Sequence, residues 1–332
     1  MELEFRWRKS AFISLLTLFL LSISNTLATG QAIRSGYTSK TLGFFPMFVA
    51  QKQGFYEREG LKVQLIQMGG SAVHQRALIA GDIHFAHINP DGVILYNERG
   101  GNLKVIAGVD NAAPYVLVGG KAYKSVGDLK GSKLGATSLV GGVATFIIEY
   151  LKAKGLQYPR DYSIVVMPGG TPARVAALEA GVIAAVPLTI PDSEIVVDRG
   201  FHRLGDIVEV LPKYQFTCVI VDPVWAERNR SAVVKFLKAH IRSLSWIHDH
   251  PAEAADYYAR EMQMKNPYAR KGIDYYTKNG VFPRDGSPSL EGLKVNIEVQ
   301  AKFGLLTTQP LPSPEKYVDL SYLRQAQKEL GL

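Results

Sequence analysis

Short β-rich runs alternate with helical patterns through most of this sequence, and this alternation constrains the fold more than any other feature. Strand-like segments at residues 32–37, 61–66 and 83–88 are separated by helical segments at 46–57 and 71–80, which end before glycines. Further segments of the first series are a helix from Asn89-Pro90 to about residue 96 and strands at 103–109 and 115–118. Such βαβ units build a mainly parallel sheet with helices on its faces.

A second series of the same kind begins at Gly119 and Gly120. Expected elements are a short helix at 125–130, strands at 133–136, 163–167 and 183–187, and helices from Gly142 to about 154 and at 171–180. After a strand at 218–221 the pattern is helical from residue 223 onward, with 232–248 the longest helix. The likeness of the two series predicts two lobes of one α/β architecture.

The first thirty residues have the order of a secretory signal peptide. Arg6, Arg8 and Lys9 precede an apolar run at 11–23, and small or polar residues follow. The apolar run is short for a bilayer, which needs about 20 residues, although an uncleaved anchor stays open. We expect residues 1–28 to be the signal peptide, with cleavage after Gly30 as the alternative. No cysteine lies near this site, so we expect a periplasmic protein without a lipid anchor.

Composition excludes several classes of function. The single cysteine, Cys218, rules out an intramolecular disulfide, a Cys-rich zinc site, an iron–sulfur cluster and a CxxC redox pair. The net charge is +8, but the basic residues are scattered singly, so we expect no nucleic-acid partner. The sequence also has no GxSxG, HExxH or phosphate-binding GxxxxGK[ST] motif, so hydrolase and nucleotide chemistry have no support.

Several short motifs, in order and at matching spacing over roughly residues 32–265, carry a resemblance to a known family. They include PMFVA at 46–50, GFY at 54–56, EGLKV at 59–63, GGS at 69–71, AGDI at 80–83, LKVIA at 103–107 and DLKGSKLG at 128–135. With these motifs the chain resembles the solute-binding proteins of ABC importers for nitrate, sulfonates, taurine and thiamine-pyrimidine precursors. It departs from them at His84 and Ala185, where the family often has acidic residues, and at 187–190, where an aromatic-rich segment is usual.

The resemblance implies a two-lobed periplasmic-binding-protein (Venus flytrap) fold of the α/β class. Each lobe is then a doubly wound, mainly parallel sheet, with lobe 1 formed by 29–119 and 215–332 and lobe 2 by 120–214. The two hinge crossings would lie near Gly119-Gly120 and at 214–216. It also implies a monomer without a cofactor, whose partners are a small organic solute and an ABC transporter membrane permease.

Ligands of open α/β sheets bind beyond the carboxyl ends of strands, where helix N-termini point free N–H groups at them. Five loops occupy that position, and we expect them to line the site. The candidate residues are Tyr37, Thr38, Ser39, Lys40, Thr41, Leu42, Gly43, Phe44, Phe45, Gly69, Gly70, Ser71, His87, Asn89, Asn111, Thr137, Ser138, Gly141, Gly142, Thr145, Thr189, Pro191 and Tyr214. The hydroxyl and glycine donors opposite Tyr37, Phe44 and Phe45 suggest a carboxylate or sulfonate on a partly apolar body.

Histidines do not predict a metal site. His84 and His87 are three apart on a predicted strand, where side chains alternate, so they face opposite sides of the sheet. We therefore expect no metal and no catalytic residue. We expect the stretch from Pro267 to Leu332 to pack on the first lobe without contributing to the site.

The leading hypothesis is a periplasmic binding protein that captures a small, anionic organic solute between its lobes for import. One alternative is a ligand sensor that presents its closed form to a membrane receptor. The other is an enzyme on the same fold, related to thiamine-pyrimidine synthesis; the family's enzymes have a cysteine-rich motif, which this chain lacks.

Overall fold

The computed structural model describes residues 32–137, 139, 142–167 and 170–332. The predicted signal peptide and the predicted site residues Ser138 and Gly141 lie outside these residues. From Ile33 onward the chain forms one compact unit. None of the helices in the described part combines the length and apolar character needed to cross a membrane.

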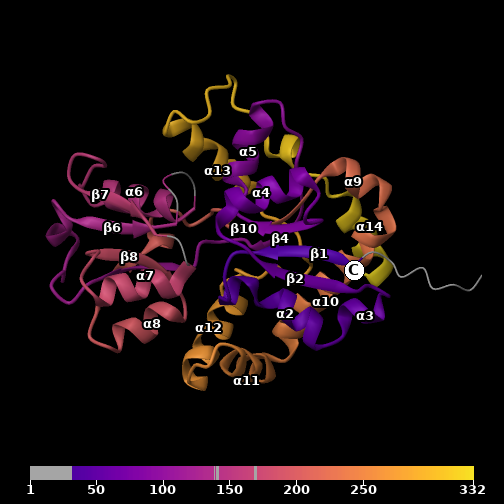
Figure 1. Ribbon diagram of the computed structural model, residues 1–332, viewed down its shortest axis with the longest axis horizontal. Helices are drawn as coiled ribbons and strands as arrows, with labels where there is room; N and C mark the ends of the chain where they lie inside the picture. The colour runs from indigo at the N-terminus through magenta and orange to yellow at the C-terminus, as the bar shows by residue number, and fades with distance from the viewer. Residues whose placement is uncertain (1–31, 138, 140–141, 168–169) are drawn as a thin grey trace, which may run out of the picture. The chain divides into compact units, whose positions relative to one another are not determined.

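The first sheet has the strand order β2-β1-β3-β10-β4 (Figure 1). Its strands are β1 (Ile33–Tyr37), β2 (Val63–Gln67), β3 (Phe85–Ile88), β4 (Lys104–Asp110) and β10 (Thr217–Val221). Strands β3 and β10 are buried along their whole length, which explains why they are almost continuously apolar in sequence.

The second sheet has the order β7-β6-β8-β5-β9. Its strands are β5 (Tyr115–Gly119), β6 (Lys133–Ala136), β7 (Ser163–Val166), β8 (Ala185–Thr189) and β9 (His202–Asp206). Strand β9 and the short helix before it were not predicted. The segment between Pro191 and Asp206 is mostly polar and shows neither the helical nor the strand spacing of apolar residues clearly.

Both sheets are mixed, with one reversed strand each. Strand β10 pairs antiparallel with β3 and β4, and β5 pairs antiparallel with β8 and β9, while the β1–β2, β1–β3, β6–β7 and β6–β8 pairs are parallel. Each reversed strand is the one that follows a passage from the other sheet. The prediction of mainly parallel sheets is therefore right for the other strands.

The chain passes between the sheets twice. The first passage, at residues 111–114, lies before β5, because β5 already pairs with β8 and β9. The crossing predicted at Gly119-Gly120 is therefore placed one strand too late; the glycine pair ends β5 and looks like a boundary in sequence. The second passage, at 210–216, contains the predicted position.

Helices cover both faces of each sheet. They are α2 (Phe45–Lys52), α3 (Phe55–Arg58), α4 (Gly70–Ala80), α5 (Asp91–Glu98), α6 (Val143–Ala153), α7 (Gly170–Glu179), α8 (Asp192–Val197), α9 (Pro223–Arg228), α10 (Arg230–Asp249), α11 (Pro251–Glu261), α12 (Asn266–Lys278), α13 (Leu290–Lys302) and α14 (Ser321–Leu330). In Figure 1, α6 lies on one face of the second sheet, and α7 and α8 lie on the other. The helix predicted at 46–57 is two helices, because Gly54 adopts the left-handed conformation (φ +67°) between them.

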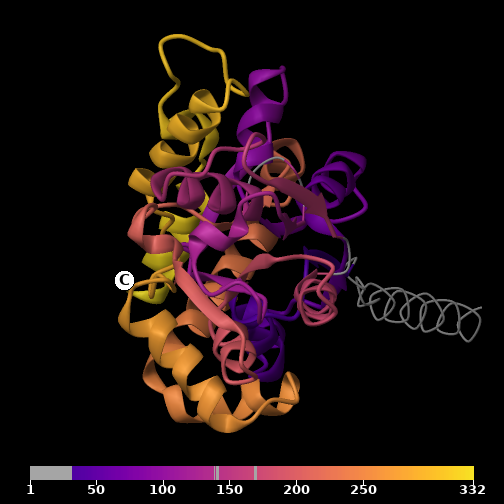
Figure 2. The ribbon, with the colours of Figure 1, turned by 90° about the vertical axis from the view of Figure 1, so that its left-hand side faces the viewer.

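The C-terminal helices do more than cover the first sheet. In Figure 2 they run along one side of the view, from orange to yellow. Ile297 of α13 packs with Ile94 and Leu95 of α5, whereas Val299 joins the apolar core of the second sheet. The predicted packing on the first lobe is therefore seen for α13, but the same helix also contacts the second sheet, because an amphipathic pattern reveals an apolar face and not its neighbour.

Candidate ligand-binding site

The loop after β1 is mostly built into the core of the first sheet. Tyr37 packs edge-on against Phe48 with 5.2 Å between ring centroids, and Phe45, fully buried, packs against Tyr258 at 5.1 Å. Leu42 is fully buried as well, and Phe44 and Thr41 are nearly so. Thr38 and Ser39 keep partial exposure and remain candidates to contact a ligand. Lys40 is exposed and pairs with Glu261 at 2.9 Å.

This loop also meets elements from further along the chain. A Cβ at Gly170, the first residue of α7, would lie 3.4 Å from the Cβ of Ser39. The carboxylate of Asp110, the last residue of β4, lies against Gly43 so closely that no side chain fits there. The first predicted loop therefore touches both the end of β4 and the start of a helix of the second sheet.

Three of the predicted residues meet around a buried acid that the sequence analysis did not select. Asp91, at the start of α5, accepts hydrogen bonds from the Tyr214 hydroxyl at 2.5 Å, from Asn296 Nδ2 at 2.6 Å and from the Gly142 N–H at 3.2 Å. Its own N–H donates to Asn89 Oδ1 at 2.9 Å. The network joins α5, the second passage, α13 and the start of α6.

Burial raises the pKa of Asp91, and these three hydrogen bonds partly offset that rise. Burial also raises the pKa of Tyr214 well above its usual value, with the neighbouring Asp91 charge adding to the effect. Tyr214 is fully buried with its hydroxyl engaged. Tyr214, a predicted site residue, thus joins the second passage to α5 through its hydroxyl.

Several other predicted residues are engaged in local structure. Asn111, in the first passage, donates from Nδ2 to Ser287 O at 2.9 Å, and Thr189 donates to Asp192 Oδ2 at 3.0 Å. Thr145 is buried, and among the described residues its hydroxyl has no partner. His87 is buried beside His240, with 6.1 Å between ring centroids. Exposed or partly exposed candidates are Gly69, Gly70, Ser71, Thr137 and Gly142.

His84, where the family often has an acid, has a structural role. Its ring stacks on Trp225 with 4.7 Å between centroids, and its Nδ1 accepts from the Arg34 N–H at 3.0 Å. Among the described residues, no three His, Cys, Asp or Glu side chains are grouped so that they could hold a metal ion.

A second set of polar side chains, buried except for the partly exposed Asp192, comes from elements of both sheets and was missed from sequence. We call it the junction cluster: Asp110 of β4, Tyr115 of β5, Arg174 of α7, Asp192 of α8 and Tyr276 of α12. The charges of Arg174, Asp110 and Asp192 all act on the Tyr115 hydroxyl, and those of Asp110 and Asp192 act on the Tyr276 hydroxyl. Burial is the first cause of the raised pKa of both tyrosines.

Arg174 is the positive charge of the junction cluster. Arg174 is only 3% exposed, and its Nη2 donates to Thr171 Oγ1 at 3.2 Å. Nε and Nη1 have no hydrogen-bond partner among the described residues, and no described carboxylate lies within ion-pair distance. Burial lowers the pKa of Arg174, although the guanidinium remains charged in water at neutral pH.

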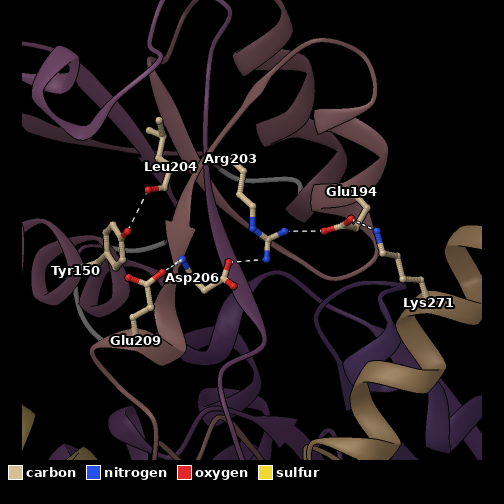
Figure 3. A network of polar contacts seen from close by, with 7 residues as sticks. All are labelled: Tyr150, Glu194, Arg203, Leu204, Asp206, Glu209 and Lys271. Carbon is tan, nitrogen blue, oxygen red and sulfur yellow. Dashed lines mark hydrogen bonds and ion pairs between the residues drawn. The ribbon is translucent and has the colours of Figure 1, made fainter.

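Ion pairs hold α12 beside α8, so that Tyr275 packs on the core of the second sheet while Tyr276 lies in the core of the first. Figure 3 shows Glu194 of α8 between Arg203 of β9, at 2.7 Å, and Lys271 of α12. Nearby, Tyr268 of α12 donates to Asp198 at 2.6 Å. Exposed pairs of this kind are each worth about 0–1 kcal/mol, so they position α12 more than they stabilise it.

The same contact leaves no room for a side chain on α12 at Gly272. A Cβ there would lie 2.9 Å from both Leu42 Cδ2 and Pro191 Cδ. The predicted residues Leu42 and Pro191, which are far apart in sequence, are therefore brought together at the face of α12 that carries Gly272.

Comparison with known proteins agrees with this architecture. The family model described as "NMT1/THI5 like" matches residues 42–254, well over half of the chain. The chain belongs to the NMT1/THI5-like family. The match includes Asp110, Tyr115, Arg174 and Asp192 of the junction cluster, whereas Tyr276 lies beyond it.

Relatives of this NMT1/THI5-like chain include binding proteins and solved structures of the same fold. YtlA of Bacillus subtilis, whose name describes it as a binding protein, is 22% identical over 75% of this chain and 76% of its own. The periplasmic nitrate-binding protein NrtA of Synechocystis has a TM-score of 0.75 and 16% identity, covering 90% of this chain and 89% of its own. The alkanesulfonate-binding protein SsuA of Xanthomonas axonopodis, bound to MOPS, has a TM-score of 0.68 and 16% identity, covering 89% and 97%.

These likenesses confirm the predicted periplasmic-binding-protein fold and the predicted resemblance. They do not identify a ligand, because the identities are low and a shared fold hosts many ligands.

Proposed function

We propose that this protein is the solute-binding component of an ABC importer, which captures a small organic anion between its two sheets and delivers it to a membrane permease. The proposal includes export by residues 1–28 and action in the periplasm as a monomer. Its support is the family, the fold shared with nitrate- and sulfonate-binding proteins, and one feature of this chain's own residues.

That feature is the buried Arg174 guanidinium, whose Nε and Nη1 have no hydrogen-bond partner among the described residues. A buried charge without a partner is costly, and the cost falls when a carboxylate or sulfonate accepts its free N–H groups. Arginine suits this purpose because its planar fork can donate two parallel hydrogen bonds to one anionic group. We therefore assign Arg174 as the counter-charge for the anionic group of the solute.

The position of the junction cluster couples ligand binding to a change in the contact between the two sheets. Its members come from elements of both sheets and from α12, and the first passage, at 111–114, joins two of them, Asp110 and Tyr115, in the chain. A solute that contacts both sides stabilises the conformation in which they meet, by its difference in affinity between conformations. A permease can then recognise that conformation.

A thermal-shift screen tests the proposal. The purified protein is unfolded and refolded to remove any bound ligand, then melted with nitrate, sulfonates, carboxylates, amino acids and pyrimidines. A solute present at about 100 times its Kd should stabilise the fold by about 2.7 kcal/mol. We expect one class of organic anion to raise the melting temperature without being consumed; consumption would instead indicate an enzyme.

The variant Arg174→Gln separates binding from folding. Because it removes a buried charge that no described carboxylate pairs with, we expect it to be at least as stable as the wild type without ligand, while its affinity for the anion falls more than tenfold. Arg199→Gln is the matched control, since Arg199 is an exposed residue of the same lobe paired with Glu179. Equal affinity of Arg174→Gln and wild type would refute the assignment.

A further inference from the structure

Two C-terminal helices contact the helices of the second sheet, and the two contacts differ in kind. On one face of the sheet, α13 meets α6 through apolar side chains: Val299 lies in the buried core, and Phe303 packs against that core. On the other face, α12 meets α8 with an ion pair and a hydrogen bond, beside the half-buried Tyr275 (Figure 1). Separating α13 from α6 exposes apolar surface to water, whereas the polar groups of α12 and α8 can exchange each other for water and salt ions.

The acceptor side of the polar contact is fixed by the second sheet itself. Glu194 of α8 accepts from Arg203 of β9 at 2.7 Å, and Arg203 also pairs with Asp206 at 2.6 Å (Figure 3). Asp198, which follows α8, accepts from the Tyr268 hydroxyl at 2.6 Å. Because Arg203 holds Glu194 from the side of the second sheet, this carboxylate keeps its position whether or not α12 lies beside it.

The donor side, on α12, is basic and open to solvent. Lys271, whose side chain is 63% exposed, reaches Glu194, and the neighbouring Arg270 is exposed as well. Attraction between exposed charges is screened by salt, with a Debye length of about 10 Å at about 0.1 M. The strength of the α12–α8 contact therefore depends on ionic strength.

This contact lies next to the proposed solute site. Asp192 of the junction cluster stands two residues before Glu194 in α8, and Tyr276 stands five residues after Lys271 in α12. The carboxyl group of Asp192 acts on the Tyr276 hydroxyl, so the two side chains are neighbours across the same contact. Movement of α12 away from α8 therefore also separates members of the junction cluster.

We propose that the α12–α8 contact is an electrostatic clasp, made of Lys271 and Tyr268 on α12 and of Glu194 and Asp198 on the side of the second sheet. The clasp holds the two sheets together when no solute is bound, and it opens as the ionic strength rises. The α13–α6 contact and the two passages stay in place and act as the hinge. The inference goes beyond the proposed function, because none of the clasp side chains belongs to the junction cluster.

Distances between two spin labels test the clasp without any ligand. One label is placed at Ala180→Cys, just after α7, and the other at Ala252→Cys on α11, whose buried side chains belong to the core of the first sheet. Both positions are exposed, and the native Cys218 is buried and stays unlabelled in the folded protein. Pulsed electron double resonance on the refolded protein then gives the distribution of distances between the labels.

We expect one narrow distribution at about 0.01 M salt and a second population at longer distance at about 1 M, since the Debye length falls from about 30 Å to about 3 Å. At the lower salt, Tyr268→Phe combined with Lys271→Gln should raise the ratio of the long to the short population about tenfold. Lys271→Arg keeps the charge and should behave as the wild type. Lys154→Gln is the matched control, because it removes an exposed pair with Glu209, at 3.0 Å, that lies between the two passages.

A distribution that moves neither with salt nor with the combined substitution would overturn the clasp. So would a long-distance population that already dominates at the lower salt, or an equal change in Lys154→Gln. None of these results bears on the proposed function, which the anion screen decides separately. A protein that opens with salt but binds no anion would keep the clasp and lose the proposed function.

Discussion

Replacing Asp192 by asparagine should stabilise the unliganded protein, and only above the pH at which the aspartate ionises. Asp192 is the first residue of α8 and a member of the junction cluster. Burial raises its pKa from the ordinary value of 3.8 to about 6, although the Thr189 hydroxyl and the Arg174 charge act in the opposite direction. The folded state therefore binds this proton more tightly than the unfolded state does.

The sign of the pH dependence follows from that difference. The stabilising contribution of the neutral carboxyl is complete below a pH of about 4 and is lost as the pH rises through about 6. Since one pKa unit corresponds to about 1.4 kcal/mol, the full difference is about 3 kcal/mol, and partial exposure of the side chain reduces our expectation to about 2 kcal/mol. Asp192→Asn never ionises, so it escapes this loss.

Urea unfolding across this pH range measures the effect. We expect the free energy of unfolding of Asp192→Asn, relative to the wild type, to rise by about 2 kcal/mol between a pH of about 4 and a pH of about 8. Asp161→Asn is a control for which the change in stability with pH has the opposite sign, because Arg160 and the Gln157 N–H lower the pKa of Asp161 to about 2. That variant should be less stable than the wild type at neutral pH and should approach it as the pH falls below about 4. A difference for Asp192→Asn that does not change with pH would refute the reasoning.

Three further predictions concern the packing around the junction. Tyr214→Phe removes one donor from buried Asp91 and should cost about 1.5–3 kcal/mol of stability in urea unfolding; no loss would contradict the network. Gly43→Ala should cost about 1–3 kcal/mol because a carboxylate fills the space its methyl group would need, whereas Gly69→Ala, with nothing within 4 Å of the new methyl group, should change stability by less than about 1 kcal/mol. Cys218 is fully buried and burial raises the pKa of its thiol, so a thiol reagent should label it only after unfolding; fast labelling of the native protein would contradict the burial.

Much of the fold could be predicted from the sequence because its strands and helices have strong local signals. Strand β6 has the predicted bounds, and α4 begins one residue before the predicted helix and ends with it. Which strands pair with each other, however, is not determined by the local sequence. Strand β5 looks like the last strand of the first series, yet it pairs in the second sheet, and nothing in its apolar run specifies that partner.

The candidate site was predictable only in part. The loops after strands were the places selected, and one of them brings Ser39 beside Gly170, the first residue of α7. Arg174 was missed because it stands on a helix among alanines, where an arginine is usually a solvent-exposed residue. Tyr276 was missed because it lies in the C-terminal helices, and only the contacts of α12 with α8 reveal which elements it reaches.

Hydrogen–deuterium exchange with the tightest ligand from the screen tests the central claim most directly, because it locates the bound solute without assuming its identity. The account predicts that ligand slows exchange together around Asp110, which ends β4 of the first sheet, and around Gly170 to Arg174 in α7, which covers the second sheet. Protection confined to one sheet, or to the surface pocket at the α11–α12 connection lined by Asp256, Arg260 and Asn266, would contradict it.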